Sequence, residues 1–183
     1  MSEVDTFVDR LYSCPLGEEG WTSFEDVCIE ILTYLFVPPL NIPRIQARTL
    51  SGTSRRDAAF PVRKTNVEQN KSWNQLIIDY NCRILLFEFK NYNKTKLSKK
   101  DVIQIFSYMR EPMGRLSILI SNKKVSRRSH IYIQRNTIYN EHKKLILILD
   151  KENLKEMLFR KERGEDPADV LLDETESFML ENE

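Results

Sequence analysis

Apolar residues at helical spacing mark the first element that this sequence predicts. From Phe24 to Leu35 they recur every three or four positions, which places their side chains on one face of a helix. Thr22 followed three residues later by Glu25 has the pattern of a capping box, so the helix is expected to begin there. The prolines from Pro38 onward end it.

The next part of the chain has the patterns of β-strands. Segments 44–50 and 55–62 are short and are separated by residues 51–54 (Ser-Gly-Thr-Ser), which is typical of a β-hairpin. Residues 83–90 (RILLFEFK) are apolar on both faces, as expected for a central strand of a sheet.

Helical and strand patterns alternate over the rest of the chain and predict an α/β fold. Helices are expected at about 67–80, 99–111 and 126–141, strands at 115–121 and 144–149, and two acidic helices at about 151–163 and 167–181. This order indicates one mixed sheet, an antiparallel hairpin plus parallel strands, flanked by helices. We expect one domain over residues 1–150, with residues 151–183 as an acidic helical extension packed on the same domain.

Length and composition are those of one globular domain. No stretch approaches the ~20 apolar residues that a membrane span needs, and the acidic amino terminus lacks the apolar run of a signal peptide. Three widely spaced cysteines, Cys14, Cys28 and Cys82, fit neither a disulfide framework nor a zinc cluster. The five glycines form no nucleotide-binding loop, which excludes a nucleotide-driven motor. We therefore predict a cytoplasmic protein that does not enter membranes.

Charge is distributed unevenly, although the net charge is only +1. Residues 44–147 carry 22 Lys and Arg against 7 Asp and Glu, whereas residues 1–43 and 148–183 each have a net charge of −7. A basic centre between acidic ends favours a polyanion such as nucleic acid as the partner. A solvated basic surface explains the same residues equally well, so charge alone does not establish that partner.

A carboxylate and an ammonium group follow the apolar run of the central strand. Because side chains alternate along a strand, Glu88 and Lys90 project to the same face while Phe87 and Phe89 point the other way. The simplest interpretation of this pair is a salt bridge at a strand end. Asp57 suggests a role beyond a salt bridge, because it is an acid directly before the apolar residues Ala58, Ala59 and Phe60 of the predicted hairpin. In the helix after Lys90, Gln104 and Tyr108 are four residues apart and therefore share a face.

This ordered set of residues resembles the PD-(D/E)xK nuclease superfamily. Asp57, Glu88-x-Lys90 and Gln104-x-x-x-Tyr108 match its motif positions, and the Asn91-Tyr92 pair resembles its Mrr-like branch, which cuts DNA in restriction and defence systems. The resemblance covers roughly residues 21–150 and implies a restriction-endonuclease-like fold. Arg56 stands where the proline of the motif would be, and no second domain for reading a target sequence is visible.

The resemblance implies a metal-dependent endonuclease acting on DNA, with Mg²⁺ or, in its place, Mn²⁺. Asp57, Glu88 and the Phe89 carbonyl would ligate the metal, and Lys90 would activate the attacking water. Gln104 would position a phosphate or the nucleophile. Glu25 is a further catalytic candidate at the border of its helix's apolar face, although its place in the capping-box pattern explains it equally well.

Contacts to the nucleic acid are predicted for basic residues near these motifs and for one tyrosine: Arg55, Arg56, Lys94, Lys96, Lys99 and Tyr108. The expected partner is a second copy of the chain, because cleavage of both DNA strands suggests a homodimer, or a separate regulatory or recognition subunit. Target choice would come from such a subunit, from DNA structure or modification, or from dimerisation. RNA as the substrate stays open. The alternative function is a catalytically silent subunit with a nuclease fold that binds nucleic acid or a partner protein.

Overall fold

The computed structural model describes residues 2–48 and 55–182, and it shows an α/β arrangement around one five-stranded sheet. The strands are β1 (Arg44–Arg48), β2 (Arg55–Pro61), β3 (Ile84–Lys90), β4 (Leu116–Ser121) and β5 (Leu145–Asp150), and they lie side by side in this order. β1, β2 and β3 pair antiparallel, whereas β3, β4 and β5 pair parallel. The mixed sheet predicted from the sequence is therefore confirmed, although the hairpin residues 51–54 lie outside the described residues.

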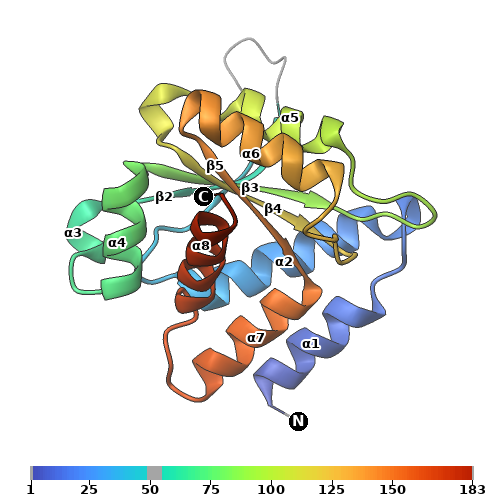
Figure 1. The fold of residues 1–183 in the computed structure, drawn as a ribbon. Coiled ribbons are helices and arrows are strands. Elements are labelled where there is room, and N and C mark those ends of the chain that lie inside the picture. Colours follow the sequence, from blue (N-terminus) through green and yellow to red (C-terminus); the bar gives the residue numbers. More distant parts are fainter. Residues whose placement is uncertain (1, 49–54, 183) are drawn as a thin grey trace.

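Helices cover both faces of this sheet (Figure 1). On one face lie α5 (Lys99–Tyr108) and α6 (His130–His142), with the short helix η2 (Glu111–Met113) after α5. The helices of the other face are α1 (Glu3–Ser13), α2 (Trp21–Phe36), α3 (Lys64–Val67), α4 (Lys71–Tyr80), α7 (Lys151–Glu162) and α8 (Asp169–Glu181), and the short helix η1 (Glu18–Gly20) directly precedes α2. The sheet is thus buried on both sides, which explains why β3, β4 and β5 are almost continuously apolar.

The alternation of side chains along β3 divides the interior into two cores. Leu85, Phe87 and Phe89 pack into the larger core with residues of α1, α2, α7 and α8. Leu119 and Ile146 of the neighbouring strands face α5 and α6 in the smaller core. Glu88 and Lys90 project from β3 toward this second face, at the end of the strand where the apolar run stops.

Two differences from the predicted elements concern the amino-terminal part of the chain. Helix α1 was not expected; Ser2 and Asp5 cap it reciprocally, and Val4, Phe7 and Leu11 bury its apolar face. Helix α2 begins at Trp21 rather than after Thr22, because Gly20 is its N-cap residue and no side chain caps it. The capping-box prediction at Thr22 is therefore wrong.

The remaining differences are local. The helix expected at about 67–80 is split into α3 and α4, and Asn70 caps the second piece by accepting from the Trp73 amide at 2.8 Å. Both acidic helices at the carboxyl end are present, and Leu154 of α7 and Phe178 of α8 belong to the larger core.

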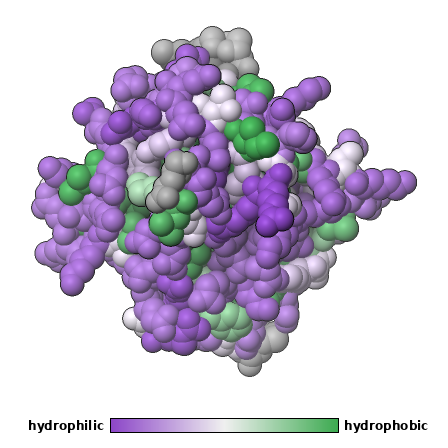
Figure 2. All heavy atoms as spheres, in the orientation of Figure 1, coloured by the Kyte–Doolittle hydropathy of each residue, from purple (hydrophilic) through white to green (hydrophobic). Residues whose placement is uncertain are grey.

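Hydrophilic residues cover most of the face seen in Figure 2, with hydrophobic residues in separate small groups. None of the helices in residues 2–48 and 55–182 is long and apolar enough to cross a membrane.

Candidate active site

At the carboxyl end of β3, the carboxylate of Glu88 and the ammonium group of Lys90 are in direct contact. Lys90 Nζ lies 2.9 Å from Glu88 Oε1, because residues two apart on a strand share one face. Both side chains are shielded from solvent, with 3% of Glu88 and 11% of Lys90 exposed. A charged pair at this depth is stabilised only if its remaining hydrogen-bonding groups also find partners.

Helix α5 supplies partners for Lys90 and for one carboxylate oxygen of Glu88. Gln104 donates from Nε2 to Glu88 Oε1 at 3.0 Å and accepts at Oε1 from Lys90 Nζ, also at 3.0 Å. The same Nε2 donates to the Tyr108 hydroxyl one turn further along the helix, at 2.9 Å. The expected shared face of Gln104 and Tyr108 is confirmed, and it is the face that meets the end of β3.

Asp57 enters the site where β2 and β3 stop pairing. The paired register of the two strands ends at Ala58 and Phe87. Beyond that point, Asp57 Oδ2 accepts the Phe89 amide proton at 2.9 Å, so a side chain takes the place of a backbone partner. This bond holds a buried carboxylate beside Glu88, and it explains why an acid is tolerated at this buried position of β2.

Helix α2 contributes the last of the predicted acids. Glu25 is only 7% exposed, whereas Glu30 on the same helix points to the surface and pairs with Arg10. The side chains of this region surround one cavity of about 450 Å³, which is lined by Trp21, Thr22, Glu25, Asp57, Glu88, Lys90, Gln104 and Tyr108. All five residues predicted to be catalytic therefore line the same cavity, although they come from four different elements.

The carboxylates of this cavity repel one another. Burial and, to a smaller extent, the charge of Asp57 raise the pKa of Glu88, Lys90 opposes both effects, and together they bring this pKa to about 7. The charge of Glu25 also raises the pKa of Glu88, by a smaller amount. Glu88 Oε2 is buried and has no hydrogen-bond partner in the described part of the chain. Additional positive charge beside Glu88 and Asp57 would relieve this repulsion.

Asp57 and Glu88 are suited to holding a divalent cation. Hard ions such as Mg²⁺ take carboxylate and carbonyl oxygens and keep several waters, so two protein carboxylates are sufficient. Among residues 2–48 and 55–182, no three His, Cys, Asp or Glu side chains gather closely enough to form a metal cluster by themselves. Glu25 lines the cavity without completing such a cluster, and a role for the Phe89 carbonyl stays a prediction.

A pair of asparagines just beyond the strand ends holds the site together, and the sequence did not single out this pair. Asn122 follows β4 and donates from Nδ2 to Asn91 Oδ1 at 2.7 Å. Asn91 in turn donates to the carbonyl oxygens of Pro15 and Gly17, at 2.9 and 3.4 Å. The end of β3 is thereby tied to the turn that precedes α2, from which Glu25 reaches the cavity.

Trp21 and Thr22 are the other cavity residues that sequence reasoning missed. Their position follows from the turn before α2, which is so tight that a Cβ atom on Gly20 would lie 1.7 Å from the Pro15 carbonyl oxygen. A Pro-x-x-x-x-Gly segment ahead of an aromatic residue was the only signal of this turn, and it is a weak one.

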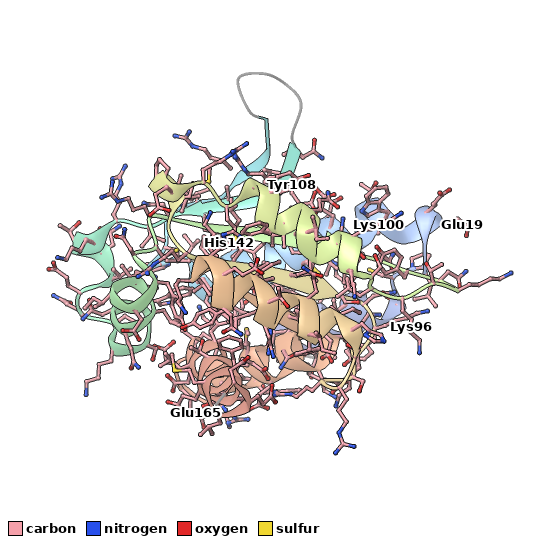
Figure 3. All side chains as sticks on the ribbon, turned by 45° about the horizontal axis from the view of Figure 1, so that its top comes forward. Glu19, Lys96, Lys100, Tyr108, His142 and Glu165 are labelled. Carbon is pink, nitrogen blue, oxygen red and sulfur yellow. The ribbon has the colours of Figure 1, made fainter. Side chains whose placement is uncertain are left out.

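The residues predicted to contact nucleic acid lie in different surroundings. Lys94, Lys96 and Lys99 are exposed on the loop after β3 and the start of α5, and Figure 3 shows Lys96 at this end of the molecule. Arg56 is buried, and desolvation followed by the charge of Arg110 lowers its pKa. The side chain of Arg55 lies outside the described residues. Tyr108 lines the cavity (labelled in Figure 3).

The chain is similar in sequence to part of a longer known protein. No family model matches the chain. A curated protein of Escherichia coli (strain K12), the "Putative transposon gamma-delta 80.3 kDa protein", is 25% identical over 160 residues, which is 86% of this chain and 22% of that protein. The chain thus spans about a fifth of the length of this relative. No solved structure matches.

Proposed function

We propose that this chain is a metal-dependent nuclease that hydrolyses DNA phosphodiester bonds. The supporting observation is that Asp57, Glu88 and Lys90 line one cavity together with Gln104, with two acids in repulsion beside an ammonium group. We also propose that the mixed sheet is a restriction-endonuclease-like fold of the Mrr-like branch. The relative's name associates it with a transposon and assigns it no activity, so the proposed activity and fold rest on the site and on the motif resemblance.

Each residue of the cavity has a distinct role in this proposal. Asp57 and Glu88 would hold Mg²⁺, which when bound supplies the positive charge that a phosphoryl oxygen needs during hydrolysis. Lys90 would offset the charge that develops on the phosphate and orient the attacking water. Gln104 keeps Lys90 aimed into the cavity by bonding both it and Glu88. Tyr108 in turn fixes Gln104.

The partners are proposed on the same basis. Exposed lysines at 94, 96 and 99 would contact backbone phosphates, which gives affinity without sequence preference. One cavity of this kind cuts one strand, so we propose a homodimer or a complex with a recognition subunit for cleavage of both strands. A cytoplasmic role in a restriction or phage-defence system is proposed from the resemblance alone.

Incubation with DNA and divalent metal tests this function. Purified protein is mixed with supercoiled plasmid, with a circular single strand and with RNA of matched length, in Mg²⁺, Mn²⁺ or EDTA. We expect nicked or linear DNA with either metal and none in EDTA. Lys90→Met should abolish cleavage, whereas Lys71→Ala, which changes an exposed lysine of α4, should cut normally.

Each outcome separates the proposed function from its alternatives. DNA that is bound but left intact in every metal would favour the catalytically silent subunit. Cleavage of RNA alone would replace DNA as the substrate. Cleavage that survives Lys90→Met would mean that the activity arises elsewhere or from a contaminant.

A further inference from the structure

A second cavity adjoins the candidate active site. It has a volume of about 490 Å³ and is lined by Gly17, Glu18, Trp21, Lys90, Asn91, Tyr92, Asn93, Lys94 and Thr95. We call it the Trp21 cleft. Trp21 and Lys90 line both cavities, so a ligand with its phosphate at Lys90 could extend directly into this cleft.

Trp21 is the largest apolar side chain exposed in the described part of the chain. Half of its surface, 51%, is open to solvent, although it sits at the first position of a helix whose other aromatic residues are packed. Exposing an indole of this size is unfavourable unless something covers it. Flat aromatic rings are the groups that nucleobases stack on, and this stacking does not depend on which base is present.

Hydrogen bonds hold the walls of the Trp21 cleft in place before any ligand arrives. Asn91 bonds the Pro15 and Gly17 carbonyl oxygens, which joins the two walls. Lys123 donates to the Asn93 and Thr95 carbonyl oxygens, the latter at 3.2 Å, and so fixes the loop after β3. The Tyr92 hydroxyl donates to Asp101 Oδ1 of α5 at 2.7 Å. A cleft built in this way loses little conformational entropy when a ligand binds.

The charges around the cleft favour a neutral group inside it and phosphates at one side. Glu18 lines the cleft and Glu19 is its neighbour in η1, so a phosphate would be repelled from that wall. Lys90 and Lys94 line the opposite wall. Glu19, Lys96 and Lys100 all lie at this end of the molecule in Figure 3. A nucleotide fits this distribution if its base enters the cleft while its backbone stays beside the lysines.

We propose that the Trp21 cleft holds an unpaired nucleobase next to the phosphate at Lys90, so that the substrate is DNA with an unpaired nucleotide beside the cut. The inference rests on the proposed function and names its substrate class: single strands, flaps, bubbles or mismatched duplexes. In a fully paired duplex both faces of each base are already stacked, so a base reaches Trp21 only where it has left the stack.

Fluorescence of 2-aminopurine, a base analogue that is quenched on stacking, tests the cleft without cleavage. A short DNA oligonucleotide carrying this base is titrated with Glu88→Gln protein in Mg²⁺, as a single strand and as a perfect duplex. We expect quenching and tight binding of the single strand only. Adding Trp21→Ala should weaken single-strand binding on the order of 10- to 100-fold and remove the quenching, while Trp21→Phe should restore most of both.

Matched controls separate this inference from the proposed function. Ile78→Ala removes an exposed apolar side chain of α4 outside both cavities and should change neither measurement. Single-strand binding with full quenching in Trp21→Ala would overturn the cleft, as would equal binding of duplex and single strand. If Mg²⁺-dependent cleavage by the unchanged protein persists in that case, the proposed function stands without the cleft. An unchanged protein that cuts no DNA would refute the proposed function itself.

Discussion

Replacing Glu88 by Gln should stabilise the metal-free protein at alkaline pH while abolishing the proposed cleavage of DNA. The carboxyl of Glu88 ionises against burial and against the charge of Asp57, and both raise its pKa. Gln keeps an oxygen that can accept from Lys90 and Gln104, as Glu88 Oε1 does. It places an uncharged group at the position of Oε2, and therefore removes the repulsion without emptying the space.

The magnitude follows from the difference between the folded and unfolded pKa values. A rise from 4.5 to about 7 means that the folded state binds more protons than the unfolded state between these pH values. Stability therefore falls as pH rises through this window, and the ionised carboxyl costs about 3 kcal/mol above it. Relative to the unchanged protein, Glu88→Gln should gain about 3 kcal/mol at pH 8 and about 1 kcal/mol at pH 5.

Urea unfolding in EDTA at pH 5, 6.5 and 8 measures this gain, with fluorescence of the buried Trp73 as the signal. Asp26→Asn, which removes an exposed acid of the same cavity-lining helix α2, is the control and should show no comparable dependence on pH. If Glu88→Gln is no more stable than the unchanged protein at pH 8, or if its gain is the same at every pH, Glu88 is not held in an unfavourable charged state.

Three further predictions concern neighbouring groups. Mg²⁺ at about 100 times its dissociation constant should stabilise the unchanged protein by about 3 kcal/mol in thermal unfolding, and Glu88→Gln should lose most of this effect; equal stabilisation would place the metal elsewhere. Tyr108→Phe removes the hydroxyl that accepts from Gln104, and should lower kcat several-fold with little change in DNA affinity; an unchanged kcat would show that Gln104 needs no such support. Asn91→Ala removes three hydrogen bonds of a buried amide and should cost about 3 kcal/mol in urea unfolding, against less than about 1 kcal/mol for the exposed Asn93→Ala.

Strand patterns predicted the sheet well because the constraints on β3 are local. A segment such as RILLFEFK is apolar on both faces, and only a strand covered on both sides tolerates that. The same alternation correctly placed Glu88 and Lys90 on one face. The contact of Gln104 with both residues was not predictable in this way, because it depends on how α5 packs against the sheet.

Helix boundaries near the amino terminus were harder to predict because two physical signals compete there. Thr22 and Glu25 have the spacing of a capping box, but Glu25 is turned into the cavity and Gly20 occupies the cap. A glycine was needed at that position for the close approach of the Pro15 carbonyl, which is a tertiary contact with no counterpart in the local pattern. Helix α1 does carry Val4, Phe7, Val8 and Leu11 at helical spacing. It was not predicted because this run spans only about two helical turns.

The pair of Asn91 and Asn122 connects the candidate active site with the Trp21 cleft, so substitutions can test which residues affect one cavity and which affect both. Asn91 and Asn122 join the ends of β3 and β4, and Asn91 also joins β3 to the turn before α2. Trp21 and Glu25 both follow that turn, so substitution of Asn91 should disturb the Trp21 cleft and the candidate active site together. A loss at Trp21 should instead affect the binding of unpaired DNA, because the indole makes none of the hydrogen bonds that position Glu88, Lys90 and Gln104. Substitution of Trp21 should therefore weaken substrate binding without displacing the reacting groups, whereas substitution of Asn91 should affect both.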